Sequence, residues 1–154
     1  PIMLRRSVRQ NLAYPLQLRG VAKDLIAREV AHWAAQVGLG DLLDHPAPRL
    51  SGGEKQKLAL ARALIRKPKV LFLDEPCANL DGRSIREIET ILRSANQNGT
   101  RIIMTTHDLG QARRLFHQIL CRFRIDMRNL FIPPGAPVAS LLFSHQKIWI
   151  RQCR

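Results

Sequence analysis

Two neighbouring acids, Asp74 and Glu75, follow directly after the apolar run of residues 70–73. A continuous apolar run of this length is typical of a strand that is buried on both faces of a sheet. Because ligands of α/β proteins bind at the carboxyl ends of such strands, both carboxylates are expected at a binding edge. There Asp74 would hold Mg²⁺ and Glu75 would accept a proton from an attacking water. Two solvated acids in a strand-to-loop corner are the weaker interpretation.

A second candidate site lies at the start of a predicted helix, where Ser51, Gly52 and Gly53 stand in sequence. Ser51 and Glu54 have the spacing of a capping box. Glycine lets a ligand approach the backbone closely, and the unpaired N–H groups of a first helical turn attract phosphate oxygens. The Ser51 hydroxyl adds a donor. Taken alone, the pattern fits phosphate binding or an ordinary capped helix start.

Two further polar positions occupy comparable places. Asp81 ends the short segment 79–81 and reads as a turn residue and helix cap. His107 stands just beyond a second apolar run, at residues 102–104. An isolated histidine is more often structural than catalytic, but this one follows a strand as Asp74 does. The neighbouring strand ends place it beside the acids.

The elements that must position these residues alternate along the chain. Pro15 interrupts a polar–apolar lead-in over residues 7–19, since proline disrupts a helix interior. Apolar residues at helical spacing predict helices that end where glycine or proline follows, and short apolar runs predict strands. The first predicted helix covers residues 21–37 and is stopped by Gly38 and Gly40, and the second runs from residue 51 to residue 67. The third starts at Asp81 and closes near Asn98 and Gly99, and the fourth covers residues 109–116. The predicted strands cover residues 70–73 and 102–104. This alternation predicts an α/β fold with a parallel sheet covered by helices.

Composition restricts the class of protein. The 154 residues include 25 Lys and Arg against 12 Asp and Glu, a net charge of +13. Such a surplus of positive charge is typical of proteins that bind nucleic acids. However, the charges lie along helical faces and the eight aromatic residues (five Phe, two Trp, one Tyr) form no basic platform, so no nucleic-acid partner is expected. Three cysteines without a CxxC pair argue against a disulfide framework or zinc site. The sequence contains no run of 18 apolar residues, so no transmembrane helix is predicted.

In chain order, these motifs resemble those of one family, the ATP-binding subunits of ABC transporters, of the prokaryotic importer type. Residues 50–56 resemble its signature loop, residues 70–75 its Walker B strand, residues 79–81 its D-loop, and His107 its switch histidine. The spacing agrees across all four motifs, and the resemblance covers residues 2–116. It implies a P-loop NTPase-like sheet and ATP with Mg²⁺ as cofactors.

The resemblance also implies a role for each residue. Glu75 and His107 would be catalytic, and Asp74 would support Mg²⁺. Asp81 would cross a dimer interface and couple two sites. The residues expected to bind the nucleotide of the opposite subunit are Ser51, Gly52, Gly53, Glu54, Gln56 and Asp81.

By the same resemblance, residues 1–50 are the remainder of a helical subdomain, residues 51–116 form the catalytic α/β half, and residues 117–154 form a divergent basic tail. The implied partners are a second ATP-binding subunit and transmembrane permease subunits, at the cytoplasmic, inner face of the membrane. The sequence of residues 50–81 resembles the corresponding sequences of importers of inorganic anions such as tungstate or phosphate.

One motif of the family does not occur. None of the nine glycines begins a GxxxxGK[ST] sequence, so these 154 residues lack the phosphate-cradling Walker A loop. We therefore expect an N-terminally truncated domain that binds ATP poorly by itself. One alternative is a truncated, inactive product. Another is an ABC-type ATPase of DNA maintenance or translation, which the absence of heptads and the sequence of residues 78–81 disfavour.

Overall fold

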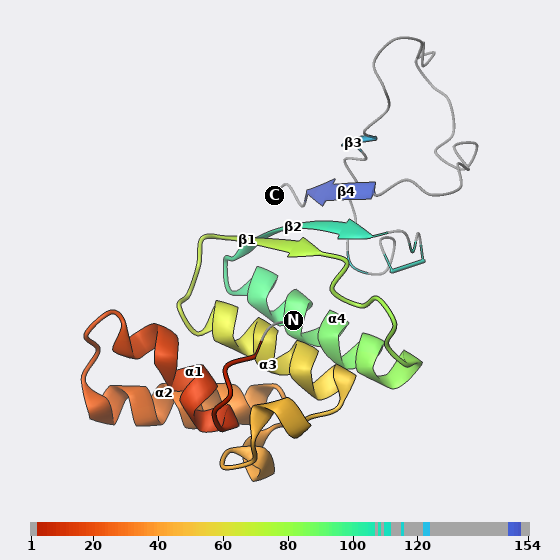
Figure 1. Cartoon of the computed structure of the whole chain (residues 1–154). Coiled ribbons are helices and arrows are strands. Elements are labelled where there is room, and N and C mark those ends of the chain that lie inside the picture. The colour runs from red at the N-terminus through yellow and green to blue at the C-terminus, as the bar shows by residue number, and fades with distance from the viewer. Residues whose placement is uncertain are drawn as a thin grey trace, which may run out of the picture.

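The computed structural model describes residues 3–106, 108, 110, 111, 115, 122, 123 and 148–151. Its first part is helical and its second part alternates helices with strands (Figure 1). The helical part comprises α1 (Val8–Gln17), α2 (Lys23–Gln36) and the 3₁₀ turns η1 (Gly40–Leu42) and η2 (Ala47–Arg49). The alternating part comprises α3 (Gly52–Leu64), β1 (Val70–Asp74), α4 (Gly82–Gln97), β2 (Arg101–Thr106), β3 (Arg122–Phe123) and β4 (Ile148–Arg151).

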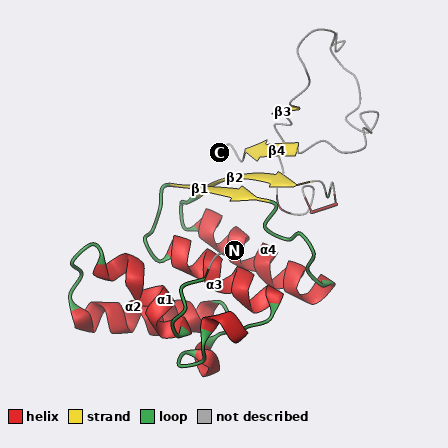
Figure 2. Ribbon diagram, viewed as in Figure 1, coloured by secondary structure: helices red, strands yellow, loops and turns green. Residues whose placement is uncertain are grey.

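Two strands of the sheet form a parallel pair. β1 and β2 run parallel, with Val70 opposite Arg101 and Asp74 opposite Thr105. This pairing, with the helix α4 between the two strands in the chain, confirms the predicted α/β fold. β4 adds to the other edge of β2 in antiparallel orientation, so the strand order is β1-β2-β4-β3 (Figure 2). The sequence did not predict this antiparallel addition.

The helices α3 and α4 lie on the same face of the β1–β2 pair (Figure 1). Leu71 points into the core and is 8% exposed, whereas Phe72 is 68% exposed. The prediction of a strand buried on both faces is therefore wrong for the described part of the chain. The physical reason is that a run of apolar residues satisfies either pattern, and only tertiary packing decides which face is covered.

α2, α3 and α4 lie where helices were predicted, although α3 ends at Leu64 and not at Lys67. The prediction is wrong near the N-terminus. There α1 includes Pro15, although residues 7–19 were expected to form an irregular lead-in. Two features compensate for the missing proline N–H. Ser7 and Gln10 form a complete capping box, and Val8, Leu12 and Leu16 are buried. Pro15 also lies in the last turn, where few helical bonds follow it.

A single apolar cluster joins the helical part to the α/β part. Its fully buried side chains include Leu12 of α1, Leu58 of α3, and Ile88 and Leu92 of α4. Of the helix predicted over residues 109–116, the structure describes Gly110, Gln111 and Leu115, which are helical; the rest lies outside the described residues. No helix in the described part of the chain is long and apolar enough to span a membrane.

Candidate functional site

Three of the predicted motifs lie on the same side of the molecule: the signature-like loop, the acid pair and the D-loop-like turn. β1 ends at Asp74, α3 begins at Gly52 and α4 begins at Gly82. Figure 1 shows the first turns of α3 and α4 on the same side as the carboxyl ends of β1 and β2. This is the edge at which ligands bind in α/β sheets. We call it the motif edge.

The acid pair is held by one threonine of the neighbouring strand. Thr105 donates its hydroxyl to Asp74 Oδ1 (2.6 Å). The Glu75 amide donates to the Thr105 hydroxyl (3.1 Å) and to the Thr105 carbonyl (3.2 Å). Glu75 has a φ of +45°, a left-handed conformation that non-glycine residues adopt mainly at turns and functional sites. Asp74 is exposed and Glu75 is half-buried, so both acids are near the surface of the motif edge.

The signature-like loop is a complete capping box. Glu54 accepts the Ser51 hydroxyl (2.7 Å) and the Ser51 amide (2.8 Å), and Ser51 Oγ accepts the Glu54 amide (3.3 Å). The bond from the Ser51 hydroxyl holds the pKa of Glu54 below its ordinary value of 4.5. Ser51 and Gly52 are exposed, and their backbone faces outward at the positive end of the α3 dipole. Such a helix start can hold phosphate oxygens.

The two glycines differ in their surroundings. A Cβ on Gly52 would make ordinary contact with Leu80 Cδ2 at 3.8 Å. A Cβ on Gly53 would overlap Ser84 of α4, whose Cβ would be 3.0 Å away. Glycine at position 53 is therefore required by the approach of α3 to α4 within this chain, a reason that the sequence did not reveal.

The D-loop-like residue Asp81 caps α4, as predicted. Its carboxylate accepts the amides of Arg83 and Ser84 (both 2.9 Å) and the Ser84 hydroxyl (2.8 Å). These bonds, the Ser84 amide first among them, hold the pKa of Asp81 below its ordinary value of 3.8. Asp81 is exposed on the motif edge.

The remaining predicted residues are Gln56, which is half-buried in α3, and His107, which lies outside the described residues. Thr105 and Ser84 were not among the predicted site residues. The parallel strand order contained a signal for Thr105, because the residue opposite Asp74 in β2 must lie near the acid pair. Ser84 carried no comparable signal, since its contact depends on how two helices pack.

The oxygen donors of the motif edge suit a hard cation such as Mg²⁺. In the described part of the chain no three His, Cys, Asp or Glu side chains gather into a metal cage. Mg²⁺ is commonly held by one or two carboxylates together with waters and substrate phosphates. An exposed carboxylate at Asp74, oriented by the Thr105 hydroxyl, fits that mode of binding.

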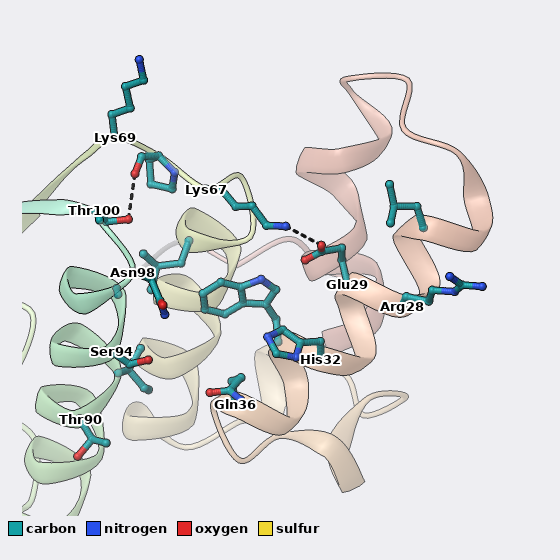
Figure 3. A pocket seen from close by; sticks show the side chains of 17 residues that line it. Arg28, Glu29, His32, Gln36, Lys67, Lys69, Thr90, Ser94, Asn98 and Thr100 are labelled. Atoms are coloured by element: carbon teal, nitrogen blue, oxygen red, sulfur yellow. Dashed lines mark hydrogen bonds and ion pairs between the residues drawn. The ribbon is translucent and has the colours of Figure 1, made fainter.

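A cavity of about 740 Å³ lies away from the motif edge, between α2, the end of α3 and α4 (Figure 3). Trp33 is one of the residues that line it, and its indole Nε1 is buried without a hydrogen-bond partner among the described residues. An ion pair between Lys67 and Glu29 (2.8 Å) lies at its rim. Of the predicted site residues that the structure describes, none lines this cavity.

The capping box at Ser51 predicts a pH-dependent contribution to stability. Because the folded-state pKa of Glu54 is depressed, its contribution is complete above the unfolded-state value of about 4.3 and is lost as the pH falls through the folded-state pKa. Ser51→Ala should cost about 0.5–2 kcal/mol of unfolding free energy near pH 7. That cost should shrink as the pH falls below the ordinary pKa of a glutamate and through the lower folded-state pKa of Glu54, as measured by thermal melts at each pH.

The matched control is Ser7→Ala, which removes the same kind of cap from α1. There the partner is Gln10, which does not titrate, so the cost of Ser7→Ala should not shrink in that way. Equal pH dependence for the two variants would contradict the assigned role of Glu54.

Comparison with known proteins places these features in one family. The family profile described as "ABC transporter" matches residues 3–78. The chain is 43% identical over 119 residues to the tungstate uptake system ATP-binding protein TupC of Peptoclostridium acidaminophilum, covering 77% of this chain and 56% of the relative. It is 39% identical over 113 residues to the lipoprotein-releasing system ATP-binding protein LolD of Hahella chejuensis, covering 73% and 49%.

A third relative is matched along almost the whole chain. The methionine import ATP-binding protein MetN of Sodalis glossinidius is 39% identical over 152 residues, covering 98% of this chain and 43% of the relative. This match reaches beyond residue 116, where the resemblance of the motifs ends. The chain spans about half the length of the curated relatives it matches.

A solved structure agrees with these relatives. The structure of CbiO1 from Clostridium perfringens, described as part of the ABC transporter complex CbiONQ, matches with a TM-score of 0.63 and 34% identity. The match covers 69% of this chain and 43% of that chain. The motifs, the relatives and the shared fold agree: this chain belongs to the family of ABC transporter ATP-binding subunits.

Proposed function

We propose that this chain is part of an ATP-hydrolysing subunit that energises solute import across a membrane. The observation that carries the proposal is the motif edge: α3 begins after Ser51, β1 ends at Asp74 and α4 begins after Asp81, all on one side of the molecule (Figure 1). Import is supported by relatives whose names describe uptake, such as the tungstate and methionine proteins. The similarity to TupC supports an inorganic anion such as tungstate as the solute.

In the proposed reaction, water attacks the terminal phosphorus of ATP, its proton passes to Glu75, and the bond to the bridging oxygen breaks to give ADP and phosphate. Asp74 would hold Mg²⁺, which neutralises charge that develops on the phosphates. Thr105 bonds to the Asp74 carboxylate and to the Glu75 backbone amide, and so holds the two residues in position relative to each other. His107 would contact the terminal phosphate in the same site.

The other half of the site belongs to a second copy of the subunit. Ser51, Gly52 and Gly53, with Glu54 and Gln56 behind them, would face ATP held by that copy, and Asp81 would cross the interface. The exposed positions of Ser51, Gly52 and Asp81 support this arrangement. We place the dimer at the cytoplasmic face of a membrane, bound to permease subunits.

The test uses an extended form, in which this chain is joined to the upstream Walker A segment of a relative. We expect the extended form to release phosphate from ATP only with Mg²⁺, and the 154-residue chain to show little turnover. A matched control replaces the lysine of the added Walker A loop and should be inactive. Absence of Mg²⁺-dependent turnover in the extended form would contradict the proposed function.

A further inference from the structure

The first turns of α3 and α4 approach each other more closely than a side chain would permit. A Cβ on Gly53 would lie 3.0 Å from Ser84 Cβ and would overlap Ser84 Oγ. Carbon atoms pack favourably at about 3.5–4.0 Å, so position 53 has no room for a larger residue. Gly53 is accordingly buried, whereas its neighbour Gly52 is exposed.

A second contact joins the same two helices one turn further along. Lys57 of α3 donates to Glu87 Oε2 of α4 at 2.8 Å, and the Lys57 side chain is only 13% exposed. Arg83 also reaches Glu87, at 3.0 Å, but that pair lies within α4 and its arginine is 86% exposed. Within the described part of the chain, it is Lys57 that joins Glu87 to the other helix.

Ser84 connects these contacts to the motif edge. On one side it packs against Gly53, and on the other its hydroxyl donates to Asp81 (2.8 Å). We propose that Ser84 is a positioning residue which, together with the Lys57–Glu87 pair, fixes the loop of Ser51 and Gly52 and the loop of Asp81 as one rigid unit. The inference deepens the proposed function and rests on it: both loops then meet the second subunit together.

The contact itself is tested in the 154-residue chain by thermal unfolding. Gly53→Ala should lower the melting temperature on the order of 5–10 °C, because overpacking forces the helices apart. The same substitution should cost much less in a Ser84→Gly background, which removes the opposing atoms. Gly40→Ala is the control, because nothing lies within 4 Å of its Cβ position. Equal costs of Gly53→Ala in both backgrounds would overturn the inference.

The positioning role is tested by ATP turnover of the extended form. Gly53→Ala should reduce kcat on the order of 10²-fold, and adding Ser84→Gly should recover most of that loss. Recovery separates positioning from a lost phosphate contact, which Ser84→Gly could not restore. Lys57→Met should reduce kcat roughly 3- to 10-fold, whereas Arg83→Met should leave it within about twofold.

The outcomes separate the two proposals. If the unsubstituted extended form shows no turnover, the proposed function is contradicted, and the inference about positioning is lost with it. If it turns over ATP but Ser84→Gly gives no recovery, or if Lys57→Met and Arg83→Met behave alike, only the inference about positioning is overturned.

Discussion

Glu75→Gln in the extended form should slow ATP hydrolysis on the order of 10²–10⁴-fold, the usual contribution of a general base. The amide keeps the size of the side chain but cannot accept the proton of the attacking water. The backbone bonds from residue 75 to Thr105 remain, so the melting temperature should change little. Phosphate release measured under saturating ATP, together with a thermal melt of the same preparation, checks both expectations.

The control for this variant is Asp24→Asn, which neutralises an exposed acid in the first turn of α2, away from every motif. It should leave the rate unchanged. An undiminished rate in Glu75→Gln would show that another group accepts the proton, and the assignment of Glu75 would then be wrong.

Leu58→Ala should lower the unfolding free energy of the 154-residue chain by about 2–5 kcal/mol, the range for large-to-small substitutions in a core. Leu58 is fully buried where α3 contributes to the apolar cluster. The corresponding fall in melting temperature is roughly 4–20 °C for a domain of this size. Far-ultraviolet circular dichroism, which reports the helix content, follows the transition.

The matched control is Leu18→Ala, because Leu18 is 70% exposed at the end of α1. It should change the unfolding free energy by at most about 0.5 kcal/mol. A melt without a cooperative transition would favour the alternative of an inactive product that does not fold, and similar effects of the two substitutions would contradict the core described above.

Much of the fold follows from signals that are local in sequence. The cap at Asp81, the capping box at Ser51 and the stops at Gly38 and Gly99 lie where the structure has helix ends. Pro15 was misleading because its local cost is offset by tertiary burial of the helix that contains it. The exposure of Phe72 was not predictable for a similar reason: which face of a sheet is covered is decided by packing.

The candidate site was predictable to the extent that topology alone determines it. In alternating helices and strands, the helix starts and the carboxyl ends of the strands fall on one side of the sheet, so this topology places Ser51, Asp74 and Asp81 on the same side. Ser84 and Lys57 could not be found in this way, because their partners are decided by the angle and separation of two helices. His107 remains a prediction.

Thr105 is almost fully buried, and it bonds to both members of the acid pair from the adjacent strand. Moving the Asp74 carboxylate or the Glu75 backbone would break a bond to this one residue. A small slide of β2 along β1 would thus carry the Asp74 carboxylate and the backbone of Glu75 in the same direction. Any displacement of β2 would therefore reach, at the same time, both acids that we propose for the hydrolytic site.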